Sequence, residues 1–240
     1  MSNDKIKLLV SPRSKVEAEE CIKAEVDIID IKNPVEGSLG ANFPWIIKEI
    51  LEIVPKNIPV SATIGDLPDL PGTASLAALG VATCGVSYIK AGIKGPKNIE
   101  DAINLMKKIS KAVKSYNKNI KVVAAAYADY KRFGTINPLL ITEVAQKAEC
   151  DVAMIDTGIK DGKGLFNFLN TDDLKKLIND GHEKNLEVAL AGSLKEKDIV
   201  VLKDLAPDII GVRGAACEGY DRLNGSIKSS RIKVLKELLV

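Results

Sequence analysis

The chain has 240 residues, of which 46% are hydrophobic and 28% charged, as is usual for a globular protein. Its 34 basic and 32 acidic residues leave a formal net charge of +2, so bulk electrostatics give no reason to expect a nucleic-acid or membrane partner. The N-terminal segment lacks the apolar core of a signal peptide, and no apolar run approaches the ~18 residues that cross a bilayer. We therefore expect a cytoplasmic protein.

The cysteine and histidine content gives no sign of a metal site. The chain has one histidine, His182, which we expect at the surface near the end of a helix. Zinc sites need clustered Cys and His ligands, and the four cysteines are far apart, so we interpret them as buried free thiols in a reducing compartment. They are Cys21, Cys84, Cys150 and Cys217.

Short runs rich in Val and Ile alternate with longer segments of helical period along the whole chain. Runs that are apolar on both faces are typical of buried parallel strands. The eight predicted strands are Ile6–Ser11, Val26–Ile31, Ile58–Ile64, Gly85–Gly92, Ile120–Tyr127, Asp151–Asp156, Leu186–Ala191 and Asp208–Val212. The predicted helices are Ser14–Ala24, Pro44–Val54, Gly72–Cys84, Lys97–Tyr116, Pro138–Glu149, Thr171–Lys184, Lys195–Leu205 and Ser226–Leu239.

This alternation predicts an α/β fold, a TIM (β/α)₈ barrel forming a single domain over residues 1–240. A doubly wound sheet is the alternative architecture. It usually has fewer strands, and no G-x-G-x-x-G motif follows the first predicted strand. Because active sites of TIM barrels lie at the carboxyl ends of the strands, those ends are the places to look for chemistry.

Two strand ends carry a lysine that we expect to point into the barrel. In the second strand, Asp30 and Lys32 alternate with Ile29 and Ile31, so the two charged side chains share one side. Lys90 is a lone charge at the end of the fourth strand. Burial and a second cation both disfavour a protonated amine, which would make Lys32 a nucleophile toward carbonyls. A purely structural Asp–Lys pair is the simpler alternative.

The sixth strand ends at Asp156, which is placed to act as a general acid or base or to orient a lysine. A glycine-rich loop over 158–164 follows and carries Lys160 and Lys163, which could bend over an anionic substrate. A flexible solvated turn is the alternative. The long loop over 33–44 lies at the same face, where loops often bind substrate. Trp45, which begins a helix, is expected to pack against the protein.

The seventh and eighth strand ends predict a phosphate site. They carry Gly192-Ser193 and Arg213-Gly214, and glycines in these two loops let backbone N–H groups approach an anion. We expect Arg213 to add a charge-assisted fork. Two tight turns without a ligand are the alternative.

At these strand ends the chain resembles a known family. LLVSP, DIIDIKNPVEGSLGANFPW, SYIKAGI, MIDTGIKDGKGLFNFL, LAGSL and GVRGAAC occur in order, over the full length, and resemble the (5-formylfuran-3-yl)methyl phosphate synthase family of methanofuran biosynthesis. The resemblance implies a TIM barrel that joins two glyceraldehyde 3-phosphate molecules, with loss of phosphate and water. It implies that Lys32 forms a Schiff base, that Lys90 accepts a proton, and that Asp156 and Lys160 belong to the site.

The implied reaction has no redox step, and the sequence shows no Cys/His ligand cluster and no dinucleotide fingerprint, so no cofactor and no metal are expected. The partner is a small phosphorylated triose, and the sequence leaves a homo-oligomer open. Three other functions stay open: a Schiff-base aldolase acting on another phosphorylated sugar, a phosphosugar isomerase without a covalent lysine, and a non-catalytic barrel that binds a phosphate ligand and regulates a partner. The last two need no buried amine, so Lys32 and Lys90 together count against them.

Overall fold

The structure, a computed structural model, describes residues 5–240 and is built on a closed barrel of eight strands in sequential order. Every neighbouring pair of strands is parallel, and β8 returns to β1 to close the barrel. The strands are β1 Lys7–Val10, β2 Ile28–Ile31, β3 Val60–Leu67, β4 Tyr88–Ile93, β5 Lys121–Tyr127, β6 Val152–Asp156, β7 Glu187–Leu190 and β8 Ile209–Val212. The predicted single-domain TIM barrel is confirmed, and the doubly wound alternative is wrong.

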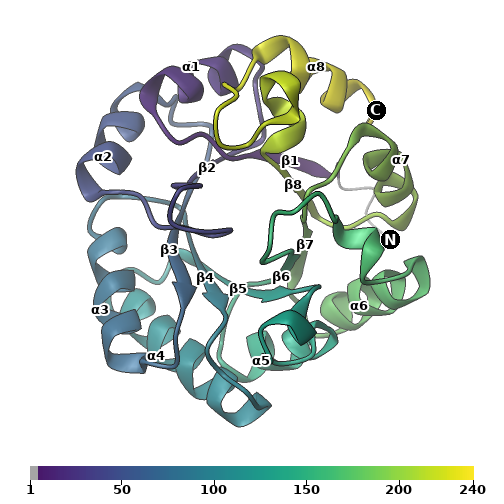
Figure 1. Cartoon of the computed structure of the whole chain (residues 1–240). Helices are drawn as coiled ribbons and strands as arrows, with labels where there is room; N and C mark the ends of the chain where they lie inside the picture. The colour runs from purple at the N-terminus through teal and green to yellow at the C-terminus, as the bar shows by residue number, and fades with distance from the viewer. Residues whose placement is uncertain (1–4) are drawn as a thin grey trace.

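The helices form a ring outside the strands (Figure 1). They are α1 Lys15–Lys23, α2 Pro44–Ile53, α3 Pro71–Ala82, α4 Ile99–Tyr116, α5 Ile141–Lys147, α6 Thr171–Glu183, α7 Glu196–Leu205 and α8 Ser229–Glu237. The predicted helix over 138–149 begins as a 3₁₀ turn, Pro138–Leu140, before α5. Within residues 5–240, no helix has the combined length and apolar character that crossing a bilayer requires.

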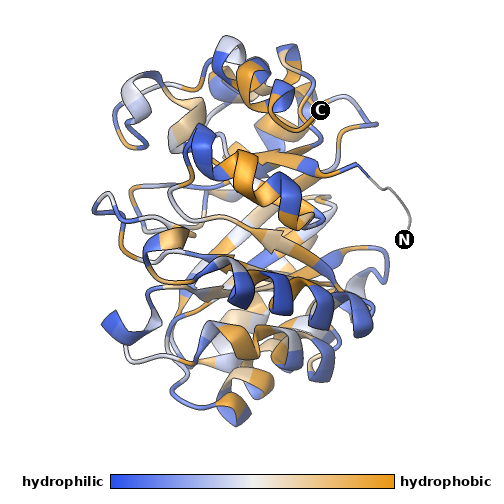
Figure 2. Cartoon of the chain, turned by 90° about the vertical axis from the view of Figure 1, so that its right-hand side faces the viewer, coloured by the Kyte–Doolittle hydropathy of each residue, from blue (hydrophilic) through white to orange (hydrophobic). Residues whose placement is uncertain are grey.

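Alternate residues of each strand face opposite sides of the barrel wall. Ile29 and Ile31 pack in the large cluster between strands and helices, whereas Ile28 belongs to the smaller cluster inside the barrel. In Figure 2 the strands at the centre are mainly coloured as hydrophobic, whereas the surrounding helices mix hydrophobic and hydrophilic segments. Asp30 therefore points inward, as the alternation predicts.

The strands end close to their predicted positions, with β3 as the largest difference. It runs to Leu67, past the predicted end at Ile64, and its pairing with β4 shifts between Thr63 and Asp66. Gly65 has a φ of +115° in this irregularity, a conformation that glycine adopts without strain. The extension carries the Asp66 carboxylate to the mouth of the barrel.

Three smaller expectations have mixed outcomes. His182 is exposed and bonds Asp208 with its Nε2, as expected for a surface residue. All four cysteines are free thiols, but Cys84 is only partly buried. Trp45 does not pack into the protein, because its side chain is 65% exposed and stacks on the ring of Phe43.

Two helical glycines provide a matched test of the packing between helices and barrel. A Cβ on Gly181 of α6 would lie 2.3 Å from Cγ2 of Val188 in β7, whereas a Cβ on Gly80 of α3 would meet nothing within 4 Å. We expect Gly181→Ala to lower the free energy of unfolding by about 1–3 kcal/mol, because overpacking outweighs the gain in helix propensity. Gly80→Ala should raise that free energy by about 0.5–1 kcal/mol.

Urea denaturation followed by circular dichroism measures both effects as shifts in the midpoint at constant slope. Equal shifts of the two variants would show that α6 does not lie as close to β7 as the structure places it.

Candidate active site

A cavity of about 400 Å³ opens at the carboxyl ends of the strands. Eight of the nine site residues predicted from the sequence line it: Lys32, Lys90, Asp156, Lys160, Gly192, Ser193, Arg213 and Gly214. The ninth, Asp30, is fully buried and contacts Lys90. The barrel thus brings together strand ends that are far apart in the sequence.

Lys32 follows directly after β2, and its side chain is almost completely buried in the cavity wall. Among the described residues, no hydrogen-bond acceptor or carboxylate pairs with its Nζ, although every other lysine of the cavity interior has such a partner. Burial lowers the pKa of Lys32 to about 7; the charge of Asp156 opposes this shift and that of Lys90 adds to it. About half of the amine is therefore neutral at pH 7.

Lys90 forms a buried ion pair with Asp30. Its Nζ lies 2.7 Å from Oδ2 of Asp30, and both side chains are at most 2% exposed. The hydroxyls of Ser11 and Ser61 donate to the same carboxylate, at 2.9 and 2.7 Å. Burial disfavours the Asp30 anion, but the charges of Lys90 and Lys32 and these hydrogen bonds lower its pKa below the usual value. Lys90 is thus held as a positioned charge next to Lys32.

Asp156 and Lys160 form a second ion pair, and the charges of both residues act on Lys32. The Lys160 Nζ donates to Oδ1 of Asp156 at 2.6 Å and to the hydroxyl of Thr157 at 3.0 Å. Burial opposes ionisation of Asp156, but the charges of Lys160 and Lys32 outweigh it and the pKa of Asp156 is lowered. The pair offers a carboxylate that can take a proton and a cation that can meet an anion.

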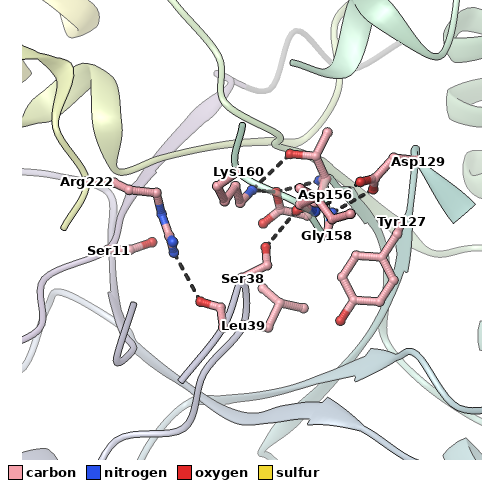
Figure 3. Close-up of polar contacts among 12 residues, drawn as sticks. Ser11, Ser38, Leu39, Tyr127, Asp129, Asp156, Gly158, Lys160 and Arg222 are labelled. Atoms are coloured by element: carbon pink, nitrogen blue, oxygen red, sulfur yellow. Dashed lines mark hydrogen bonds and ion pairs between the residues drawn. The ribbon is translucent and has the colours of Figure 1, made fainter. Parts of the chain in front are cut away.

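The loop that carries Lys160 is anchored by a buried carboxylate. Asp129, at the end of β5, accepts hydrogen bonds from the backbone N–H groups of Gly158 and Ile159, at 2.6 and 2.9 Å (Figure 3). Hydrogen bonds from backbone amides to a charged carboxylate are among the strong ones. The segment after β6 is therefore anchored where Lys160 leaves it, rather than being a freely solvated turn.

The loop over 33–43 folds into the barrel mouth (Figure 1). Leu39 is fully buried among the side chains inside the barrel. Asp66 accepts from the backbone N–H groups of Ser38 and Leu39, at 2.9 and 3.2 Å, and from the hydroxyl of Tyr127. The Ser38 hydroxyl reaches across to the carbonyl of Thr157, at 2.7 Å. These hydrogen bonds hold the loop in place directly after Lys32.

The loops after β7 and β8 present backbone donors to the cavity. Gly192 has a φ of +119° and Ser193 a φ of +49°, so the chain turns sharply at the end of β7. Within residues 5–240, the backbone N–H groups of Ser193, Gly214 and Ala215 donate to no protein acceptor. Unpaired amides that line a cavity are suited to bind an anion.

Arg213 does not offer the free fork that the sequence predicts. Its guanidinium forms a bidentate pair with Glu17, at 2.7 and 3.1 Å, and also donates to the carbonyl oxygens of Ser11 and Arg222. Both charged side chains are at most 5% exposed. The fork is directed at the buried Glu17 carboxylate, so we correct the expectation that it faces a phosphate.

Four functional contacts were missed from the sequence: those of Glu17, Asp66, Asp129 and Arg222. Asp129 was visible as a carboxylate two residues after the last residue of β5, which is a signal for a strand-end role. Asp66 gave no such signal, because β3 was expected to end before it. Within the described residues, no group of three or more Cys, His, Asp or Glu side chains has the arrangement of a metal site.

Comparison with known proteins identifies the family of the chain. The family described as 4-HFC-P synthase matches residues 8–236. A (5-formylfuran-3-yl)methyl phosphate synthase of Methanocaldococcus jannaschii is 54% identical over 231 residues, covering 96% of this chain and 98% of the relative. The enzyme of the same name from Methanopyrus kandleri is 52% identical over 233 residues, covering 97% and 98%.

Solved structures show the same fold at much lower identity. KGPDC from Streptococcus mutans has a TM-score of 0.65 and 14% identity, over 98% of this chain and 97% of its own. A 3-hexulose-6-phosphate synthase has a TM-score of 0.64 and 18% identity, over 98% and 100%. At this identity the likeness concerns the barrel alone, whereas the match to the curated relatives runs nearly end to end at half of all positions. The chain therefore belongs to the 4-HFC-P synthase family.

Proposed function

We propose that this chain is a lyase that condenses two molecules of glyceraldehyde 3-phosphate into (5-formylfuran-3-yl)methyl phosphate, with loss of phosphate and water, in methanofuran biosynthesis. The name of its relatives supports the product. The observation that carries the proposal is the buried Lys32 amine, which lies near two lysine–carboxylate pairs and has no such partner of its own.

The neutral Lys32 amine attacks the aldehyde of the first triose and forms an imine after loss of water. The protonated imine acidifies the adjacent C–H bond, so removal of that proton gives an enamine, which is a carbon nucleophile. Attack on the second triose makes the new carbon–carbon bond. β-Elimination expels one phosphate, and water hydrolyses the imine to release the aldehyde and restore the Lys32 amine. Cyclisation with dehydration gives the aromatic furan. No step changes the overall oxidation state, so the proposal includes no cofactor.

The two ion pairs suit the proton transfers and charges of this sequence. The Asp156 carboxylate lines the cavity and is ionised, so it can accept the proton next to the imine. The charge of Lys90, which pairs with Asp30, favours the neutral form of Lys32. Lys90 is the second candidate, besides Asp156, for moving a proton in this sequence. Lys160 contributes a cation that can stabilise the departing phosphate. The amides of Ser193 and Gly214 are suited to hold the phosphate that is retained.

The carbonyl chemistry at Lys32 can be tested directly. Borohydride reduction in the presence of glyceraldehyde 3-phosphate should add a triose-derived mass to the peptide that contains Lys32, as measured by mass spectrometry. Lys32→Arg should lose this adduct and nearly all activity, because a guanidinium stays protonated and cannot attack the aldehyde. An active wild-type enzyme whose Lys32 remains unmodified would exclude the covalent mechanism.

The pH dependence should report the same amine. Only the neutral form attacks, so the second-order rate of adduct formation should rise with pH through a midpoint near 7, the pKa of Lys32. Below that midpoint the rate should fall about tenfold per pH unit. Asp156→Asn removes a charge that raises the Lys32 pKa, so the midpoint of its adduct formation should move to lower pH. A midpoint near the ordinary lysine value would show that the amine is not desolvated.

Product identity separates this function from a Schiff-base aldolase that acts on another phosphorylated sugar. Incubation with glyceraldehyde 3-phosphate alone should release inorganic phosphate and yield a furan aldehyde, recognised by its mass and ultraviolet absorption. An aldolase would instead return a non-aromatic sugar phosphate that retains both phosphates. Lys32 adduct formation is common to both, so the product decides between them.

A further inference from the structure

Arg222 lies in the segment between β8 and α8 and lines the cavity. Its guanidinium donates only to two backbone carbonyl oxygens of the loop over 33–43: that of Gly37 at 3.1 Å and that of Pro34 at 3.4 Å. Figure 3 shows this side chain entering the barrel mouth from a different side than Lys160. The two cations therefore flank the same space.

Arg222 differs from the other four arginines of the chain in its electrostatic partners. Each of those four pairs with a carboxylate: Arg13 and Arg213 with Glu17, Arg132 with Asp161, and Arg231 with Glu196. Within residues 5–240, no carboxylate lies within 4 Å of the Arg222 guanidinium. Within the described residues, Arg222 is therefore the arginine whose charge has no carboxylate partner, and it lines the cavity.

This lack of a counter-ion is costly, because the Arg222 side chain is also partly buried. Burial lowers the pKa of Arg222, while the more distant charges of Asp156 and Asp66 oppose the shift. A guanidinium remains protonated in spite of such a shift, so the desolvated charge persists. Two carbonyl contacts, one of them long, compensate it poorly. An anion with two oxygens to share matches the fork and supplies the missing charge.

The backbone of Arg222 is held firmly, although its side chain is not. The Nε of Arg213 donates to the carbonyl oxygen of Arg222 at 2.8 Å, and Arg213 is itself locked by Glu17. The buried pair thus serves to present the neighbouring arginine to the cavity. This gives Arg213 a role at the end of β8 although its own guanidinium is paired with Glu17 and is not free to bind a ligand.

We propose that Arg222 is a phosphate-binding residue that takes two oxygens of one substrate phosphate and gives up its contacts to Pro34 and Gly37. The inference rests on the proposed function for the phosphorylated nature of the substrate. Because the proposed reaction uses two phosphorylated trioses, the cavity needs a second anion site besides the amides after β7 and β8. Arg222 provides that site between the β8–α8 segment and the loop over 33–43.

Binding of glycerol 3-phosphate tests the proposal without any chemistry, because this probe has no carbonyl and cannot form an imine. Calorimetric titration should show that Arg222→Ala weakens its binding about 10- to 150-fold, the loss expected for a charge-assisted contact. Arg222→Lys should recover only part of the affinity, because an ammonium cannot make the fork. Titration with inorganic phosphate should show the same order if the phosphate group alone is recognised.

Arg13→Ala is the matched control. Arg13 also contacts the β8–α8 segment, through the carbonyl oxygen of Leu223, but it does not line the cavity. Its loss should change the affinity for glycerol 3-phosphate less than twofold. Thermal melting of each variant separates a lost contact from a lost fold, and Arg222→Gln, which can keep a carbonyl contact, replaces Arg222→Ala if the latter does not fold.

Wild-type affinity in Arg222→Ala, or in Arg222→Gln in its place, would overturn the proposal, as would a wild-type protein that binds neither probe. An equal loss in Arg13→Ala would also overturn it, because the effect would then belong to the segment and not to the guanidinium. The furan assay is read separately. If Arg222→Ala weakens probe binding but the wild-type protein makes no furan, the phosphate site stands and the proposed reaction is wrong. If the wild-type protein makes the furan but Arg222→Ala binds the probe as well as the wild type does, the reaction stands and the phosphate site is wrong.

Discussion

The site depends on one electrostatic arrangement: a buried amine without a counter-ion, near one buried and one partly buried lysine–carboxylate pair. Burying a single cation is unfavourable, so a buried amine is either paired with an anion or loses its proton. Lys90 is paired with Asp30, and Lys160 is paired with Asp156. Lys32 has no such partner, and its pKa is lowered to about 7, so it loses its proton more easily. The same residue type thus serves as a fixed charge at two positions and as a nucleophile at the third, and only the surroundings differ.

The remaining architecture holds these three lysines in place at the barrel mouth. The strands supply the inward positions, and the loops position the side chains further. Each loop is bonded to a carboxylate, which is buried at Asp129 and Glu17 and half-buried at Asp66. Asp129 holds the segment of Lys160, Asp66 holds the loop that follows Lys32, and Glu17 holds Arg213. Such bonds between a charge and backbone amides or a guanidinium are directional as well as strong. They fix the backbone around the site, and fixed geometry favours proton transfer between positioned groups.

The sequence predicted the parts that depend on local periodicity, and it failed where contacts cross the chain. Alternation in one strand is enough to place Asp30 inside the barrel, and eight repeats are enough to predict the closed barrel. The partner of Arg213 lies 196 positions away, so no local pattern could show that Glu17 takes its fork. Arg222 stands in an irregular loop with no period to read. Trp45 was expected to pack because it is large and apolar, yet helix α2 begins at the rim, where its outer face meets solvent.

The cavity uses only part of the barrel circumference. Its lining, within residues 5–240, comes from the ends of β1, β2, β4, β6, β7 and β8, with nothing from β3 or β5. The reason is the loop over 33–43, whose Leu39 fills the interior on that side and whose backbone is bonded to Asp66 of β3. The mouth is therefore divided into two sectors. Near β3 and β5 it is filled by the loop over 33–43, which follows the reactive lysine, and at the other strand ends it is open to ligands. A barrel of this kind can change what it accepts through the segments after β7 and β8 while its reactive lysine stays unchanged, because the two tasks are assigned to different sectors.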